Sequence, residues 1–379
     1  MTIRRAIYHN PLAESWTAPI KEEKAAATKF HEQLPSYAQT QLVSLDYVAH
    51  EIGVKSVLLK DESSRLGLPS FKILGASWGT FCAVTQKLHL PFDTTLDQVQ
   101  ATLSRCPITL FAATDGNHGR AVARMGKILG VPVSIFVPAT MHVRTKNFIR
   151  EEGAEIVECH SSYDMAVQTA FSEAEKVGGI LVQDTAFDGY TDIPSWIVNG
   201  YRTMFREIDA QIGDRTVDLV IAPVGVGSFA QAVALHYKSP GRSTKVLTVE
   251  PDTAACLWMS LKKGENTPIE TEHTIMAGLD CGTVSSIAWP ILRDGVDASI
   301  TISDLESHQA SQDLAQHSIS AGPCGSAPLA ALRKLRKEDL ESLQLTDKST
   351  VVLLCTEGAR EYEFPRDVSS AIPHCQQEP

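Results

Sequence analysis

Short runs rich in β-branched residues alternate along this chain with segments of helical pattern, and this alternation restricts the fold more than any other feature. Strands that alternate with helices are typical of parallel sheets covered by helices. The sequence therefore predicts an α/β fold, and no period suggests an internal repeat. The expected strands are 56–60, 109–113, 132–137, 155–158, 180–183, 219–223, 245–249 and 351–354.

Two loop-like stretches divide the chain. One is the polar stretch 87–104, and the other is 186–194. Such stretches are typical of crossings between domains. We therefore expect a small domain at 87–192 and a larger, discontinuous domain at 1–86 and 193–379. The polar, proline-containing tail after Phe364 has the composition of an arm.

Composition limits the class of function. The chain has 379 residues, of which 43% are hydrophobic and 21% charged, which is enough for two domains with their own cores. A net charge of −11 without a basic stripe disfavours nucleic-acid and membrane partners and favours small-molecule chemistry. The eight cysteines form no C-x-x-C pair, which disfavours a zinc site or a secreted disulfide framework. No signal-peptide pattern or membrane-length apolar run is present, so we expect a cytoplasmic protein.

Lys72 is the first candidate for chemistry, because it stands between a short polar turn and a helix start rich in small residues. An amine can capture an aldehyde cofactor such as pyridoxal phosphate only if burial and neighbours lower its pKa. Phe71 and Ile73 would supply the apolar wall. The alternative, which this segment alone favours, is a surface lysine that opens an ordinary helix.

The loop 114–119 follows an expected strand and precedes a helical run. Its glycines would let the backbone approach a ligand, Asp115 offers a carboxylate, and Asn117 offers a neutral donor and acceptor. The alternative is a helix N-cap with turn glycines. His118 is expected to be a structural hydrogen-bonding group rather than a base.

The loop 223–230 lies between an apolar strand and a helix. Successive backbone amides at a helix N-terminus form an anion site, so we expect this loop to bind a phosphate. It also fits G-x-G-x-x-A with Glu250 at the end of the next strand, so a dinucleotide site is an alternative. The late position of the loop and the presence of Lys72 argue against that site. A purely structural tight turn is a third reading.

Two further loops follow expected strands. Asp184 could serve acid–base chemistry opposite Asp115, although a turn-capping aspartate is the commoner outcome. Thr356 could bond a heterocyclic nitrogen without protonating it, or simply begin a loop. Glu357 is either a solvent-facing charge or a partner for a cationic substrate group.

Taken together, these segments resemble the fold-type II pyridoxal-phosphate enzymes, which include the tryptophan synthase β subunit and threonine dehydratase. Within that group the chain is most similar to the diaminopropionate ammonia-lyases. The resemblance runs nearly end to end. Its motifs are NPL at 10–12, TQL at 40–42, KDES at 60–63, SFK at 70–72, TDGNHGR at 114–120, QDTAFDGY at 183–190, GVGSF at 225–229, VEP at 249–251, MAGLDCG at 276–282 and CTEG at 355–358.

The resemblance implies a two-domain fold with the active site in the cleft between the domains, and a homodimer. It implies that Lys72 holds pyridoxal 5'-phosphate as a Schiff base, and that Asp115 and Asp184 take the α-proton from opposite substrate enantiomers. It also implies a cofactor site in which Asn117 bonds the 3-hydroxyl, Thr356 the ring nitrogen and the loop 225–229 the phosphate. The full set of implied cofactor-binding residues is Phe71, Lys72, Asn117, Gly225, Val226, Gly227, Ser228, Phe229 and Thr356.

The implied reaction is α,β-elimination of ammonia from 2,3-diaminopropionate to give pyruvate. Dehydratases of this superfamily carry a serine where Asp115 stands, whereas the ammonia-lyases carry an aspartate. Stretches 319–325 and 359–361 depart from the ammonia-lyase pattern and should lie near the cofactor. Three alternatives therefore stay open: a serine or threonine dehydratase, a β-replacement enzyme, and a non-catalytic carrier of the cofactor. Cys256 and Cys281 flank a loop expected at the pocket, and a redox pair there is a separate hypothesis.

Overall fold

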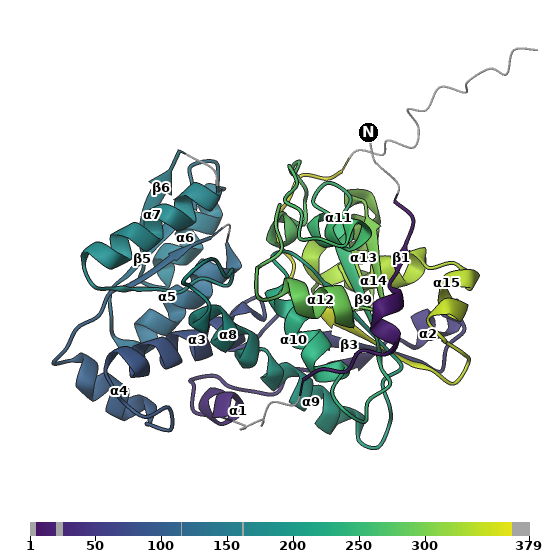
Figure 1. The fold of residues 1–379 in the computed structure, drawn as a ribbon, viewed down its shortest axis with the longest axis horizontal. Helices are drawn as coiled ribbons and strands as arrows, with labels where there is room; N and C mark the ends of the chain where they lie inside the picture. Colours follow the sequence, from purple (N-terminus) through teal and green to yellow (C-terminus); the bar gives the residue numbers. More distant parts are fainter. Residues whose placement is uncertain (1–4, 20–25, 115, 161–162, 366–379) are drawn as a thin grey trace, which may run out of the picture.

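The computed structural model describes residues 5–19, 26–114, 116–160 and 163–365. Figure 1 shows two lobes, each built around one β-sheet. The expected two-domain α/β fold with mostly parallel sheets is confirmed. Most of the expected C-terminal arm, including Cys375, lies outside the described residues. No helix within the described ranges has both the length and the apolar character needed to cross a bilayer.

The larger lobe contains a seven-stranded sheet. Its five central strands run parallel, and its two short edge strands are antiparallel to their neighbours. The sequence predicted four of these strands, and it missed both edges and β10. In spatial order the strands are β1 (Tyr8–His9), β10 (Ala298–Ile302), β9 (Lys245–Pro251), β8 (Leu219–Pro223), β11 (Thr350–Cys355), β3 (Ser56–Asp61) and β2 (Leu42–Ser44).

Both faces of this sheet are buried. In β8, Val220 and Ala222 belong to one hydrophobic core, whereas Leu219 and Ile221 belong to another. Successive side chains of a strand point to opposite faces, so a strand covered on both sides reads as a continuous apolar run. That is why the central strands could be found in the sequence. The elements of this lobe outside the sheet are α2 (Asp46–Ile52), α9 (Arg202–Ile212), α10 (Ser228–Tyr237), α11 (Cys256–Lys263), α12 (Trp289–Gly295), α13 (Asp304–Gln316), α14 (Pro323–Lys334), α15 (Lys337–Ser342) and the 3₁₀ helices η1 (Pro11–Glu14) and η2 (Ala277–Leu279).

The smaller lobe contains a four-stranded sheet in which all strands run parallel. Its strands fall at 110–181, inside the expected small domain. The stretch 87–104 is not simply a polar loop, because a capping box formed by Thr95 and Gln98 starts helix α4 there. The elements of this lobe are β6 (Glu155–Cys159), β5 (Val133–Pro138), β4 (Leu110–Ala113), β7 (Ile180–Leu181), α4 (Leu96–Leu103), α5 (Asn117–Leu129), α6 (Val143–Glu151) and α7 (Tyr163–Lys176).

Three helices lie where the lobes meet: α1 (Ala26–His31), α3 (Lys72–Lys87) and α8 (Asp192–Gly200). Helix α3 is buried almost all round from Ile73 to Thr85, and it packs against α5 on one side and α8 on another. A Cβ on Gly75 would lie 2.5 Å from the ring of Tyr201, so only glycine allows α3 this close to the end of α8. This packing fixes the start of α3, where Lys72 stands. Because α3 contacts both lobes, the expected domain bounds remain a prediction.

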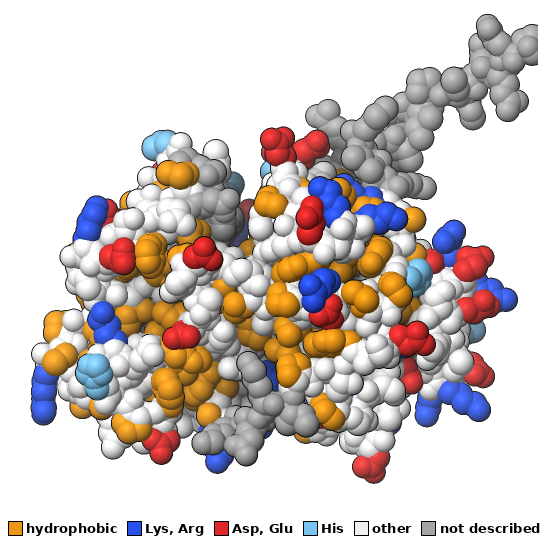
Figure 2. Space-filling model, viewed as in Figure 1, with side chains coloured by type: hydrophobic (Ala, Val, Ile, Leu, Met, Phe, Trp, Pro, Cys, Tyr) orange, Lys and Arg blue, Asp and Glu red, His pale blue; other side chains and the backbone are white. Residues whose placement is uncertain are grey.

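The surface carries charges of both signs. On the face in Figure 2, lysine and arginine side chains are interspersed with aspartate and glutamate over the larger lobe. Among the described residues on that face, no continuous basic stripe is visible. A hollow separates the two lobes at the top of the view, on the side where the cavity described next lies.

Candidate active site

One cavity of about 680 Å³ lies between the two lobes, at the carboxyl ends of β4, β8 and β11. This is the size of an ordinary small-molecule site and the place where open α/β sheets bind ligands. Asp115 lies outside the described residues, and every other site residue expected from the sequence lines the cavity. Those residues are Phe71, Lys72, Asn117, Asp184, Gly225, Val226, Gly227, Ser228, Phe229 and Thr356.

A buried charge cluster holds the segment that leads to Lys72. The guanidinium of Arg65 donates to the carboxylates of Glu62 and Glu207 at 2.6–2.7 Å, and all three side chains are at most 4% exposed. Lys60 adds a second cation 2.7 Å from Glu207. Buried charges are tolerated only when they are paired and hydrogen-bonded. The cluster therefore ties the segment between β3 and α3 to helix α9.

Lys72 forms an ion pair with Asp184 inside the cavity. Burial by itself would lower the pKa of Lys72, but the carboxylate of Asp184 outweighs burial and raises that pKa above its usual value. The expectation of a lowered lysine pKa is thus wrong for the chain without a cofactor. Burial would likewise raise the pKa of Asp184, but Lys72 and then His118 lower it to about 2. Both groups are therefore charged at neutral pH.

The glycine loop before α10 is built for close approach. A Cβ on Gly225 would lie 2.9 Å from the carbonyl oxygen of Gly278, and Gly227 has a φ of +90° that side chains rarely allow. The first-turn amides of α10 have no acceptor within the helix. Because residues 225–230 line the cavity, these amides are available to an anion.

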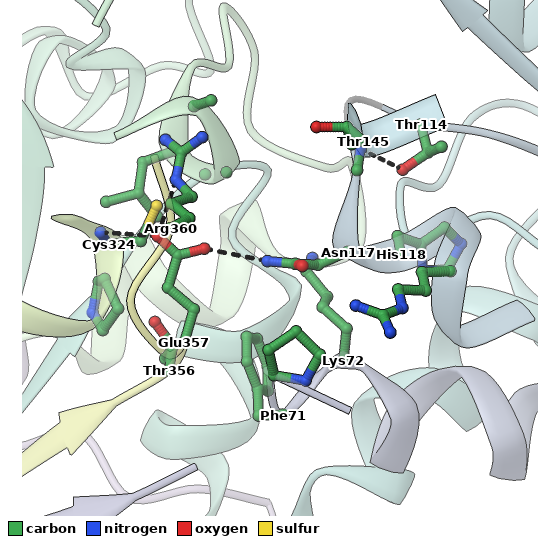
Figure 3. A pocket seen from close by; sticks show the side chains of 18 of the residues that line it. Phe71, Lys72, Thr114, Asn117, His118, Thr145, Cys324, Thr356, Glu357 and Arg360 are labelled. Atoms are coloured by element: carbon green, nitrogen blue, oxygen red, sulfur yellow. Dashed lines mark hydrogen bonds and ion pairs between the residues drawn. The ribbon is translucent and has the colours of Figure 1, made fainter. Parts of the chain in front are cut away.

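Glu357 links the two lobes across the cavity. Its carboxylate accepts a hydrogen bond from Asn117 at 2.9 Å and another from the amide of Cys324 at 3.1 Å, and Arg360 lies 3.5 Å away (Figure 3). The side chain is 5% exposed, so the reading of Glu357 as a solvent-facing charge is wrong. Arg360 in turn donates to the carbonyl oxygen of Ile275.

Thr356 and Phe71 lie together on the floor of the cavity. The amide of Phe71 donates to the carbonyl oxygen of Thr356 at 3.2 Å. The ring of Phe71 packs against Phe229 and Tyr201, with centroids 4.3 and 4.9 Å apart. These contacts join the start of α3 to the phosphate-type loop and to the end of β11. The apolar wall expected around Lys72 is present.

The sequence missed the contribution of helix α6. Arg144, Thr145 and Phe148 line the cavity from the small lobe, and no motif singled them out. Arg144 forms an ion pair with Glu361 of the larger lobe, across the mouth of the cavity. The two departures from the ammonia-lyase pattern were correctly expected near the site, since Cys324 and residues 359–361 line the cavity.

The dinucleotide reading lacks its carboxylate. Glu250 is fully buried and accepts the backbone amides of Leu257 and Trp258, both at 2.7 Å, at the start of α11. Its oxygens are thus committed to capping a helix, whereas a dinucleotide site needs an acidic side chain on a ribose. The seven described cysteines are all free, Cys256 and Cys281 included. Within the described residues, no group of three or more His, Cys, Asp or Glu side chains could hold a metal ion.

Comparison with known sequences gives one family. The family model described as pyridoxal-phosphate dependent enzyme matches residues 34–357. Diaminopropionate ammonia-lyase of Escherichia coli (strain K12) is 32% identical over 381 residues, which cover 96% of this chain and 95% of that protein. Serine racemase of Mus musculus is 30% identical over 54% of this chain and 58% of its own length.

Solved structures agree with these sequences. The structure of diaminopropionate ammonia-lyase from Escherichia coli in complex with D-serine matches with a TM-score of 0.85 and 31% identity, over 93% of each chain. A bacterial-type threonine deaminase, from the source abbreviated T.th., matches with a TM-score of 0.72 and 26% identity, over 89% of this chain and 97% of that one.

Proposed function

The chain belongs to the family of pyridoxal-phosphate dependent enzymes, and we propose that it eliminates ammonia from 2,3-diaminopropionate to give pyruvate. The pairing of Lys72 with Asp184 beside an anion-binding loop is the observation that carries the proposal, because it joins an amine, a base and a phosphate cradle in one cavity. The similarity to diaminopropionate ammonia-lyases over nearly the whole chain favours this substrate.

The cofactor of the family is pyridoxal 5'-phosphate, and the residues of the cavity fit it. Lys72 is the amine that would carry its aldehyde carbon, and the loop from Gly225 to Phe229 offers amides for its phosphate. We assign its 3-hydroxyl to Asn117 and its ring nitrogen to the hydroxyl of Thr356. Phe71 would contact it from the apolar wall. When bound, the cofactor supplies the electron sink for the electrons of the broken Cα–H bond.

The protein itself supplies the proton transfers. Asp184 is held as a carboxylate by the ammonium of Lys72, so it can accept a proton once that ammonium is displaced. We assign Asp184 as the base for one substrate enantiomer and Asp115 as the base for the other. A positioned carboxylate typically contributes about 10²- to 10⁴-fold to such a step.

The cleft architecture would limit access of water to the reacting atoms. The segment 358–363 covers one side of the cavity, and the Glu361–Arg144 pair joins it to α6 of the opposite lobe. Exclusion of water strengthens electrostatic interactions in the site and protects a reactive product from side reactions. We assign this segment to closure over the substrate.

An assay of ammonia and keto acid with a panel of D- and L-amino acids tests the proposal. Release of both products from 2,3-diaminopropionate, at a rate well above that from serine or threonine, is the expected result. Pyruvate from serine alone would identify a dehydratase. A yellow protein that releases no keto acid from any amino acid would identify a carrier, and either result would refute the proposed substrate.

The exchange Asp115→Asn tests the division of labour between the two bases. We expect it to leave cofactor absorbance unchanged and to lower turnover of one enantiomer by at least about 100-fold. Normal turnover of both enantiomers would contradict the assignment. We further propose that the protein is a homodimer in the cytoplasm, which is in keeping with seven unpaired described cysteines. Mass measurement in solution tests the dimer.

A further inference from the structure

The imidazole of His118 has one bonded nitrogen and one nitrogen without a partner. Nε2 lies 2.8 Å from the carbonyl oxygen of Val182. Nδ1 is buried without a hydrogen-bond partner, and it lies 4.0 Å from Oδ2 of Asp184. An unpaired buried nitrogen carries a cost in free energy. The side chain is 6% exposed, so solvent offers it little compensation.

The bond to Val182 determines which nitrogen carries the proton. A carbonyl oxygen can only accept, so Nε2 must carry hydrogen and donate it. Burial lowers the pKa of His118, so the ring is neutral and Nδ1 holds a lone pair. Nδ1 and the carboxylate oxygen of Asp184 are thus both acceptors, and no hydrogen lies between them. One added proton on Oδ2 would make the two atoms complementary.

We infer that His118 is a positioning residue that stabilises Asp184 in its protonated form, after Asp184 has taken the α-proton of the substrate. This inference rests on the proposed function. The Cα–H bond breaks, its electron pair stays with the substrate and its cofactor, and the proton forms an O–H bond at Oδ2. That O–H then donates a hydrogen bond to Nδ1 of His118. Return of the proton to solvent or to product regenerates the carboxylate.

The pair is built to persist while the lobes move. His118 stands on α5, and Asp184 follows β7, so both belong to the small lobe. The carbonyl that orients the ring belongs to Val182, two residues before Asp184 in the same segment. The distance between Nδ1 and Oδ2 therefore depends little on how the larger lobe closes. Lys72, by contrast, reaches Asp184 from the start of α3.

Two substitutions separate this role from a purely structural one. His118→Gln keeps a donor at the position of Nε2 for the carbonyl of Val182, but it offers no acceptor to Asp184. His118→Asn keeps an acceptor near the position of Nδ1 and loses the bond to Val182. In the cofactor-loaded enzyme we expect His118→Gln to lower kcat about tenfold for the enantiomer that depends on Asp184, with KM and melting temperature unchanged.

For His118→Asn we expect the converse, a lower melting temperature with kcat closer to that of the parent. A parent-like kcat in His118→Gln would overturn the inference, whether or not His118→Asn is impaired. An equal loss for both enantiomers in His118→Gln would also overturn it, because His118 would then not act through Asp184.

A spectroscopic measurement needs no substrate. Long-range ¹H–¹⁵N correlation spectra of the cofactor-loaded enzyme with labelled histidine, assigned by comparison with His118→Gln, report the tautomer directly. We expect a neutral ring protonated at Nε2 at neutral pH. An imidazolium, or a ring protonated at Nδ1, would refute the inference even if ammonia release is confirmed. The predicted tautomer in a protein that releases no ammonia would refute the proposed function alone.

Discussion

Replacing Lys72 with methionine in the cofactor-free protein should destabilise the fold, because it leaves Asp184 as a carboxylate that is only 5% exposed and has lost its cation. Removing one partner of a buried ion pair costs about 3 kcal/mol or somewhat more. The unfolding entropy is about 2.1 cal/mol/K per residue, so for a chain of this length the melting temperature should fall by about 4 °C.

The sign of the pH dependence is part of this prediction. In the parent, the pKa of Asp184 is lowered to about 2, so its contribution to stability is present above the unfolded pKa and is lost only as the pH falls towards 2. In Lys72→Met, burial without the cation raises the pKa of Asp184 above its unfolded value. The penalty is then present at pH 8 and shrinks as the pH falls through that raised pKa.

Thermal unfolding of the cofactor-free parent, the two single variants and the double variant Lys72→Met/Asp184→Asn is the assay. The double variant should recover more than half of the loss caused by Lys72→Met, because no buried charge remains unpaired. Losses that simply add in the double variant, or a gap that is equal at pH 5 and pH 8, would refute the reasoning.

Three further predictions follow from the same contacts. Gly225→Ala places a Cβ 2.9 Å from the carbonyl oxygen of Gly278, so it should weaken cofactor binding about tenfold in an absorbance titration, and an unchanged dissociation constant would contradict the cradle. Arg65→Ala should cost about 3–5 kcal/mol of unfolding free energy, whereas the control Arg336→Ala, at a side chain 71% exposed, should cost less than about 0.5 kcal/mol in the same denaturation experiment. Burial raises the pKa of Glu250 to about 7, so the unfolding free energy should fall by up to about 3 kcal/mol as the pH rises from about 5 to about 7, and Glu250→Gln should remove this fall.

The sequence predicted the parts of the fold in which local pattern and tertiary position agree. The central strand β8 has the expected bounds, because burial on both faces produces an unbroken apolar run. The edge strands β1 and β2 are only two and three residues long, too short to leave a pattern. Helix α4 was missed because the polar composition of 87–104 concealed its capping box.

The site was predictable where glycine and polar residues follow a strand, since strand ends meet at one edge of the sheet. Lys72, Asn117, Asp184 and Thr356 were found in this way. The residues of α6 were not, because they reach the cavity from a helix and carry no motif. The direction of the Lys72 pKa was also missed, because it depends on a carboxylate 112 positions away in the chain.

Borohydride reduction of the cofactor-loaded protein, followed by peptide mass spectrometry, tests the central claim most directly. The account predicts one pyridoxyl adduct, located on Lys72 and absent from Lys72→Ala. An adduct on another lysine, or a purified protein that stays colourless and unmodified in the presence of the cofactor, would contradict it.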